Sequence, residues 1–143
     1  MVWSGYERTE PMNKVVARFA DGHTLKGMTA DFSPAKDIFH VSPADAPDTA
    51  DPLEVRATEL KALFFVKSLE GDRGYDETRE FDPMKPAVAR RIKVVFKDGE
   101  VLVGTTTGYR PNRPGFFLEP ADDRSNNERC YVVSADTREV RFV

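Results

Sequence analysis

Cysteine, histidine and long apolar runs are all scarce in this sequence. Cys130 is the single cysteine, so no disulfide can form within the chain, and a reducing compartment is the simplest expectation. No apolar stretch approaches the roughly 20 residues that a membrane helix needs. The first eight residues lack the basic start and the apolar stretch of a secretory signal. We therefore expect a cytoplasmic protein that makes no contact with a membrane.

An excess of basic residues is also absent. The chain has 21 Lys and Arg against 24 Asp and Glu, which gives a net charge of −3. Nucleic-acid binders draw most of their affinity from neutralising phosphates and usually have a basic surface. The overall charge therefore counts against nucleic-acid binding, although it leaves room for a local basic loop.

Motifs for catalysis and metal binding are missing as well. A structural metal site needs closely spaced His and Cys ligands, whereas His23 and His40 are the two histidines and Cys130 lies far along the chain. No nucleophile has a base and an orienting group in a recognisable motif, and no Gly-rich phosphate loop occurs. We predict that the protein is not an enzyme and uses neither a metal nor a cofactor, with one exposed histidine and one strand histidine.

The sequence does contain an internal repeat, with an offset of 77 residues between Phe19 and Phe96. Phe-Ala-Asp-Gly at 19–22 reappears as Phe-Lys-Asp-Gly at 96–99. Without a gap, the same offset pairs Leu25 with Leu102, Gly27 with Gly104, Pro34 with Pro111, Phe39 with Phe116, and Phe65-Val66 with Phe142-Val143. One register held over 14–66 and 91–143 predicts duplication of one structural unit. Units this short are marginally stable alone, so we expect the copies to pack together.

Each copy begins with a pattern typical of a β-hairpin. Apolar and polar residues alternate over 14–19 and over 91–96, and Asp-Gly follows in both copies. A two-residue loop would place Phe19 opposite Thr24. A three-residue loop with a left-handed glycine would place Phe19 opposite Leu25, and we favour it because Phe then faces Leu in both copies.

The strand pattern predicts the fold and the domain boundaries. An inward glycine, Gly27 or Gly104, would let the second strand bend sharply. Three further short strands follow in each copy, so we predict an all-β protein of two tandem five-stranded SH3-like barrels. The predicted segments are an N-terminal segment (1–12), the first barrel (13–67), a charged linker (68–89) and the second barrel (90–143). We expect the linker to be a loop or a short surface helix, tethered by Phe81 and Met84.

The hairpin motif resembles that of a known group of domains. The run Val-x-Phe-x-Asp-Gly-x-x-Leu-x-Gly, followed by an aromatic residue, is matched by 17–27 with Phe32 and by 94–104 with Tyr109. It resembles the first motif of Sm-like domains, which are SH3-like barrels that often bind RNA as rings. Their second motif, an Arg-Gly or Lys-His element, is not matched, since this chain has Ala-Thr-Glu at 57–59 and Ser-Ala-Asp at 134–136. The chain is also similar to uncharacterised bacterial domains with an Asn-Asn-Glu-Arg-type loop. The resemblance implies the barrel without the residues of its nucleotide pocket.

Two loops of the second copy carry the candidate ligand-binding residues. One joins its second and third strands (110–115), and the other joins its third and fourth strands (122–129). Their arginines and asparagines suit planar or phosphate ligands. The alternative is that these side chains cap turns and form surface pairs. The candidates are Arg110, Asn112, Arg113, Arg124, Asn126, Asn127 and Arg129.

Three valines form a candidate interface. Val95, Val101 and Val103 occupy the outer face of the second hairpin, where the first copy has Arg, Thr and Lys. Valines on a face that should be solvated indicate a covered surface. The cover would be the first copy, the N-terminal segment with Trp3 and Tyr6, or another chain.

These observations order the possible functions. The leading hypothesis is a non-enzymatic binding or adaptor module that recruits a protein partner in a bacterial regulatory context. It rests on the missing catalytic groups, the acidic balance and the valines. The alternative is an RNA-binding Sm-like protein that uses the Arg/Asn loops, and an enzyme ranks last. A homo-oligomer is compatible with the sequence.

Overall fold

The protein is almost entirely β-structure. The computed structural model describes residues 12–47, 49–71, 77, 79–81 and 89–143. In these residues, ten strands form one antiparallel sheet, and two 3-10 turns, η2 (Ala57–Glu59) and η3 (Ser134–Asp136), are the helical pieces. The strands are β1 (Asn13–Phe19), β2 (Thr24–Thr29), β3 (Ile38–Pro43), β4 (Leu53–Arg56), β5 (Leu60–Val66), β6 (Arg90–Phe96), β7 (Val101–Thr106), β8 (Gly115–Pro120), β9 (Asn127–Val133) and β10 (Thr137–Phe142). The predicted all-β class is confirmed.

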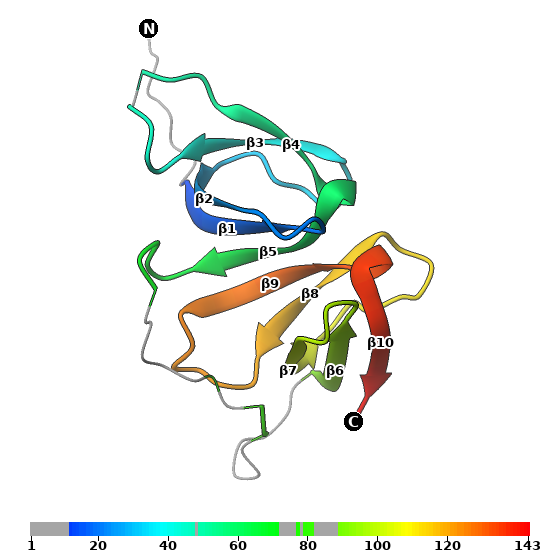
Figure 1. Cartoon of the computed structure of the whole chain (residues 1–143). Coiled ribbons are helices and arrows are strands. Elements are labelled where there is room, and N and C mark those ends of the chain that lie inside the picture. Colours follow the sequence, from blue (N-terminus) through cyan, green and yellow to red (C-terminus); the bar gives the residue numbers. More distant parts are fainter. Residues whose placement is uncertain (1–11, 48, 72–76, 78, 82–88) are drawn as a thin grey trace, which may run out of the picture.

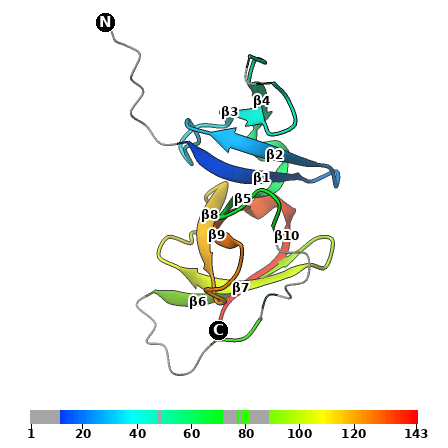
Figure 2. The same cartoon turned by 90° about the vertical axis from the view of Figure 1, so that its left-hand side faces the viewer.

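The strand order divides the sheet into two halves with the same internal order. Across the sheet the order is β10-β6-β7-β8-β9-β5-β1-β2-β3-β4. Figure 1 shows β1–β4 in one half, β6–β8 and β10 in the other, and β5 beside β9 between them. Figure 2, turned by 90°, shows the same division. The halves are continuous because β5 pairs antiparallel with β9, with Ala62 opposite Val132 and Phe64 opposite Cys130.

The composition of β5 suits its central position. All seven of its residues, Leu-Lys-Ala-Leu-Phe-Phe-Val, are buried, whereas β10 has no fully buried residue. Leu63 and Phe65 pack into the core of the first half, while Ala62, Phe64 and Val66 pack into the core of the second. A nearly continuous apolar run is typical of a strand that is covered on both faces. Each core therefore includes residues from both halves.

The hairpin turns have the predicted conformation but a different register. Gly22 and Gly99 have φ of 102° and 92°, as the left-handed glycine requires. The Phe19 N–H donates to the His23 carbonyl at 2.9 Å, so Phe19 lies opposite His23 and Leu25 lies opposite Ala17. The predicted pairing of Phe19 with Leu25 is therefore wrong by two residues. A shift of two keeps every side chain on its face, so the alternation of apolar residues could not distinguish these registers.

The inward glycines allow neighbouring strands to approach closely. A Cβ atom on Gly104 would lie 2.0 Å from the Glu119 carbonyl oxygen of β8, and one on Gly27 would lie 2.2 Å from the Ser42 carbonyl oxygen of β3. No side chain fits at these distances. Glycine is therefore required where β2 crosses β3 and where β7 crosses β8.

The linker is partly described, and its described part contains no helix. The Arg91 guanidinium lies 4.9 Å from the centre of the Phe81 ring, so Phe81 contacts β6 as expected. Met84, Trp3 and Tyr6 lie outside the described residues. Across the described ranges, no helix combines the length and apolarity needed to span a bilayer.

Candidate ligand-binding groove

The structure separates the two loops that the sequence analysis singled out. Residues 110–114 precede β8 and residues 121–126 follow it, so the loops lie at opposite ends of that strand. A strand of this length separates its two ends by roughly 17 Å. Arg110, Asn112 and Arg113 therefore belong to one end of the half, and Arg124, Asn126 and Asn127 to the other. The predicted residues do not form one site.

The loop after β8 has a structural role. The Asn126 side chain accepts from the Ser68 N–H at 3.0 Å and donates to the Ser68 carbonyl at 2.9 Å. The Lys67 N–H donates to the Asn126 carbonyl at 2.8 Å, and the Asn127 N–H donates to the Ser125 hydroxyl at 3.0 Å. The bonds of Asn126 join the loop to the segment that follows β5, and its side chain acts as the turn-capping alternative expects, whereas Asn127 contributes its backbone N–H and not its side chain.

Arg129 stacks on aromatic rings of the central strands. Its guanidinium carbon lies 4.3 Å from the centre of the Phe65 ring and 4.8 Å from that of Phe117. Such cation–π contacts stabilise by about 0.5–1 kcal/mol at exposed sites. Arg129 therefore connects β5 to β8 across β9.

Two of the three valines are covered within the chain itself. Val95 and Val103 are buried, and Val101 is half-buried. Phe81 contacts Arg91, which points to the same side of β6 as Val95 because residues four apart in a strand share a face. Val95 and Val103 are thus covered within the chain, whereas Val101 lines an open pocket, and the interface itself stays a prediction.

An open groove lies where the two halves meet. Two adjoining pockets of about 360 and 270 Å³ share Pro34, Pro114 and Tyr131, and we call them together the Tyr131 groove. The larger pocket lies between the β2–β3 connection and the η2 and η3 turns. The smaller pocket follows the β7–β8 connection. Figure 1 shows η2, η3 and this connection together at the right of the molecule. Most side chains of the larger pocket are apolar, including Phe32, Ala35, Ala57, Val133 and Ala135.

Aromatic packing holds the groove in shape. The Phe32 ring lies edge-on to the rings of Phe39, Tyr131 and Phe117, with centroids 5.1, 5.0 and 6.2 Å apart. Gly115 begins β8 directly beneath Tyr131, since a Cβ atom there would lie 2.5 Å from the tyrosine ring. Phe32 comes from the first half and Tyr131 from the second, so the groove needs both halves.

Two hydroxyl groups of the groove are unpaired. The Ser134 Oγ atom is buried and has no hydrogen-bond partner among the described residues. The Tyr131 hydroxyl also makes no hydrogen bond to any described residue, and burial of the residue raises the pKa of this phenol. An unpaired buried polar atom such as Ser134 Oγ is rare in folded proteins, whereas the Tyr131 hydroxyl is not fully buried and can meet a ligand.

The charged side chains of the groove are mostly cations. Lys36, Arg110 and Arg113 line it, and none of the three side chains has an ion-pair or hydrogen-bond partner in the part of the chain that the structure describes. The Asp37 carboxylate is already occupied. It accepts from the Thr58 N–H at 3.0 Å and lies 3.6 Å from the Arg56 guanidinium. The groove is therefore electropositive in a chain with a net charge of −3.

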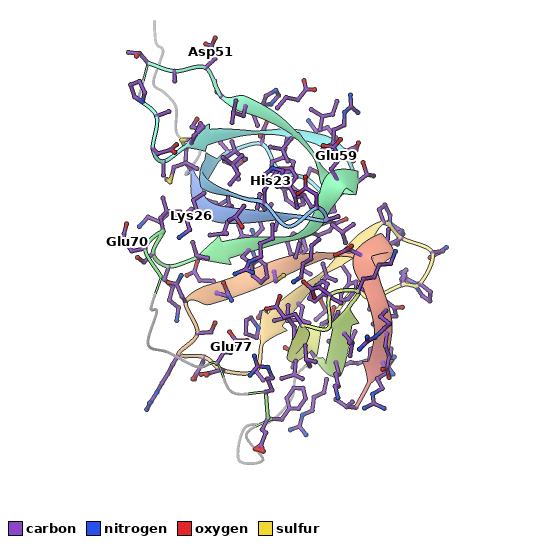
Figure 3. The ribbon with its side chains drawn as sticks, in the orientation of Figure 1. His23, Lys26, Asp51, Glu59, Glu70 and Glu77 are labelled. Atoms are coloured by element: carbon purple, nitrogen blue, oxygen red, sulfur yellow. The ribbon has the colours of Figure 1, made fainter. Side chains whose placement is uncertain are left out.

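A second pocket of about 360 Å³ lies on another side of the central strands. Unlike the cations of the Tyr131 groove, two of its cations have partners within the chain. Its Lys26 ammonium donates to the Leu69 carbonyl at 3.0 Å, and its Arg18 guanidinium lies over the Phe64 ring at 5.5 Å. Figure 3 labels Lys26 and Glu70 at the left of the molecule and Glu59, the last residue of η2, at the right. The Lys26 and Arg18 side chains of this pocket already have partners within the chain, so the Tyr131 groove is the better candidate.

Sequence reasoning missed a buried cation that joins the halves. Lys61 of β5 is only 5% exposed, and its ammonium donates to the carboxylates of Asp98, at 2.6 Å, and Glu100. Burial alone would lower the pKa of Lys61, but these two hydrogen bonds outweigh it and raise the pKa. The signal in the sequence was one lysine within an otherwise apolar strand, because a buried lysine needs a partner.

The histidines do not assemble a reactive centre. His23 Nδ1 lies 2.5 Å from the Asp21 carboxylate and His40 Nδ1 lies 2.7 Å from that of Asp31, both at the surface. Cys130 is buried, and burial raises the pKa of its thiol. Over the described ranges, no three His, Cys, Asp or Glu side chains gather as a metal cluster.

Fold and groove together define an all-β protein with one ten-stranded antiparallel sheet and a ligand-sized groove between its halves. The chain belongs to the Family of unknown function (DUF6982), whose model matches residues 11–143. No curated protein and no solved structure matches the chain.

Proposed function

We propose that this protein is a non-enzymatic binding module that recruits a protein partner through the Tyr131 groove. The observation that carries this proposal is an open apolar groove whose cations and Tyr131 hydroxyl have no hydrogen-bond or ion-pair partner within the described chain. Recognition sites are typically apolar concavities with a few polar groups that fix the orientation of the ligand. The groove has this character, whereas the pocket that contains Lys26 and Arg18 uses these two cations in contacts within the chain.

The architecture proposed for this module is a pair of SH3-like barrels that arose by duplication. Both halves have the same order of strand pairing, and a 3-10 turn precedes the last strand in each. Both hairpins turn on a glycine with positive φ. On this proposal, pairing of β5 with β9 fuses the copies side by side and creates a groove that one barrel alone would lack.

RNA binding is the second candidate, and the unpaired Arg110 and Arg113 favour it. Several observations count against it. Arg124 lies at the far end of β8, and Arg129 is already stacked on two rings. Binding of single-stranded RNA requires a basic path along successive phosphates with exposed stacking surfaces, whereas the floor of the groove is apolar and only one end of it carries arginine.

Selection of displayed peptides tests the proposal. Random 12-residue peptides would be selected on the purified protein, and the enriched peptides would be titrated by fluorescence anisotropy. Ala135 lines the groove and is exposed, so Ala135→Trp should fill the groove and weaken binding at least 10-fold. Ala50 is exposed in the β3–β4 connection and serves as the matched control, since Ala50→Trp should leave binding unchanged.

Two outcomes would overturn the proposal. One is enrichment of peptides that bind the wild-type protein and Ala135→Trp equally. The other is an absence of peptide binding together with salt-sensitive binding of labelled U-rich or A-rich RNA that is lost when Arg110 and Arg113 become alanine, which would establish the RNA reading instead.

A further inference from the structure

We infer that the Tyr131 groove recognises an extended acidic peptide segment, in which an apolar side chain is flanked by Asp or Glu residues. This inference rests on the proposed function and specifies its ligand. The ligand is a protein segment because the walls of the groove, its unpaired Tyr131 hydroxyl and its charges each match a different part of such a segment.

The apolar part of the ligand fits the larger pocket. Phe32, Val133 and Ala135 contribute to its walls, and its volume of about 360 Å³ is large enough for one or two apolar side chains. Burial of an apolar side chain there supplies about 25 cal/mol for each Å² removed from water. An entirely polar ligand would gain nothing from this surface.

The backbone of the ligand is matched by the unpaired hydroxyl of Tyr131. This hydroxyl can donate to a peptide carbonyl, whereas the Ser134 Oγ atom is fully buried and out of reach of a ligand. Addition of the ligand as a further strand is disfavoured, because Pro34 and Pro114 have no N–H and the Pro114 carbonyl already accepts from the Ser134 N–H at 2.9 Å. The segment is therefore expected to lie across the groove, held by its side chains and a few carbonyls.

The charge of the ligand is set by the smaller pocket. Arg110 and Arg113 line it, next to the wall that Pro114 shares with the larger pocket. A guanidinium group binds a carboxylate through two parallel hydrogen bonds, and neither arginine has a partner in the described residues. The one carboxylate of the groove, that of Asp37, lies in the larger pocket and is held by Thr58 and Arg56. Acidic residues of the ligand are thus directed toward the β7–β8 connection.

Four labelled peptides of equal length test the inference. All would share a central Leu-Phe pair; three would be amidated at the C-terminus and have an acidic, a neutral or a basic flank, and the fourth would have a neutral flank and a free C-terminal carboxylate. At low salt we expect the acidic peptide to bind at least 10-fold more tightly than either neutral peptide, and the advantage to shrink as salt rises. Arg110→Glu/Arg113→Glu should reverse the order, so that the basic peptide binds best.

A matched control uses the other end of β8. Arg124 is exposed there, so Arg124→Glu changes the net charge in the same direction without touching the groove and should leave the order of the peptides unchanged. Circular dichroism and urea unfolding would establish that each variant is folded. Since Arg110 and Arg113 are exposed, their replacement should leave the unfolding midpoint unchanged.

The possible failures are distinguishable. Equal binding of acidic and neutral peptides, with loss of both in Ala135→Trp, would overturn the acidic chemistry and leave the proposed function standing. Tightest binding of the peptide with the free carboxylate would assign the arginines to a chain terminus and would also overturn the acidic flank. The proposed function itself would be overturned if no peptide bound. It would also be overturned if every peptide bound Ala135→Trp as tightly as it binds the wild-type protein.

Discussion

The Lys61 ammonium on β5 lies 2.6 Å from the Asp98 carboxylate in the β6–β7 turn, and this ion pair joins the first half of the sheet to the second. Asp98 is the aspartate of the repeated Asp-Gly motif. Its counterpart Asp21 pairs with His23, two residues away. Both aspartates accept from the backbone N–H two residues further on, so the motif closes the turn in both halves, and Asp98 adds a contact between the halves.

Replacement of Lys61 should destabilise the protein. Lys61→Met replaces the lysine with an apolar side chain of similar length. The substitution leaves the Asp98 and Glu100 carboxylates close together without a cation. We expect the free energy of unfolding to fall by about 2 kcal/mol, less than for a fully buried pair because both carboxylates keep some contact with water. Urea unfolding would measure this. Lys61→Met/Asp98→Asn/Glu100→Gln should recover most of the loss, whereas a single variant as stable as wild type would show that the pair contributes nothing.

Acid should weaken the protein through Asp98. The hydrogen bond from Lys61 lowers the pKa of Asp98 below its ordinary value of 3.8. The native state therefore holds fewer protons than the unfolded chain near that pH, so the contribution of Asp98 is complete above about pH 5 and disappears as the pH falls through its lowered pKa. Urea unfolding at several pH values should show a smaller acid loss for Asp98→Asn than for wild type. Asp21 and Asp31 also have lowered pKa values, so the difference between the two proteins is the quantity to compare.

Lys61 should make the protein less stable at alkaline pH. Its pKa is raised above the ordinary value of 10.5, so its contribution is complete below that pH and is lost as the pH rises through the raised pKa. The free energy of unfolding of Lys61→Met should therefore fall less than that of the wild-type protein as the pH rises through the alkaline range. An alkaline loss of equal size in both proteins would contradict this assignment.

Two glycines of the second half should respond very differently to alanine. Gly104→Ala would place Cβ 2.0 Å from the Glu119 carbonyl, so β7 and β8 would have to separate. Forced overpacking of this kind typically costs about 1–3 kcal/mol. Gly108 has no atom within 4 Å of a Cβ position, and Gly108→Ala should change the unfolding free energy by less than about 0.5 kcal/mol. Equal effects of the two changes would mean that the strands do not cross as closely as described.

The two phenylalanines that share a position in the repeat should also differ. Phe65 on β5 is 3% exposed, and its counterpart Phe142 on β10 is 37% exposed. Phe65→Ala should lower the free energy of unfolding by about 3–5 kcal/mol, and Phe142→Ala by about 1 kcal/mol or less. Thermal or urea unfolding of both variants would measure the difference. Equal losses would indicate that β5 has no special place in the packing.

The sequence predicted the elements of the fold better than their assembly. Periodicity and Asp-Gly turns predicted the strands, because these signals are local. Pairing of β5 with β9 was not predicted, since contact between copies leaves no mark in the repeat. The difference between Leu-Lys-Ala-Leu-Phe-Phe-Val at 60–66 and Thr-Arg-Glu-Val-Arg-Phe at 137–142 was the available signal, and it indicates which strand is covered on both faces.

The candidate site was predicted only in part. Arg110 and Arg113 were singled out by composition, and both line the Tyr131 groove. Their grouping with Arg124 overlooked the strand between the loops. Phe32 and Tyr131 come from different halves, so the groove became visible only once the pairing of β5 with β9 was known.

The partner of β5 is made late during synthesis. β5 ends at Val66 and β9 begins at Asn127, so about 60 residues separate them, a delay on the order of several seconds at ~5–20 residues per second. Until β9 leaves the ribosome, the nascent first half presents an unpaired strand edge with Ala62, Phe64 and Val66 uncovered. Such an edge pairs readily with other chains. We therefore expect the yield of soluble protein to depend on how fast the second half is translated.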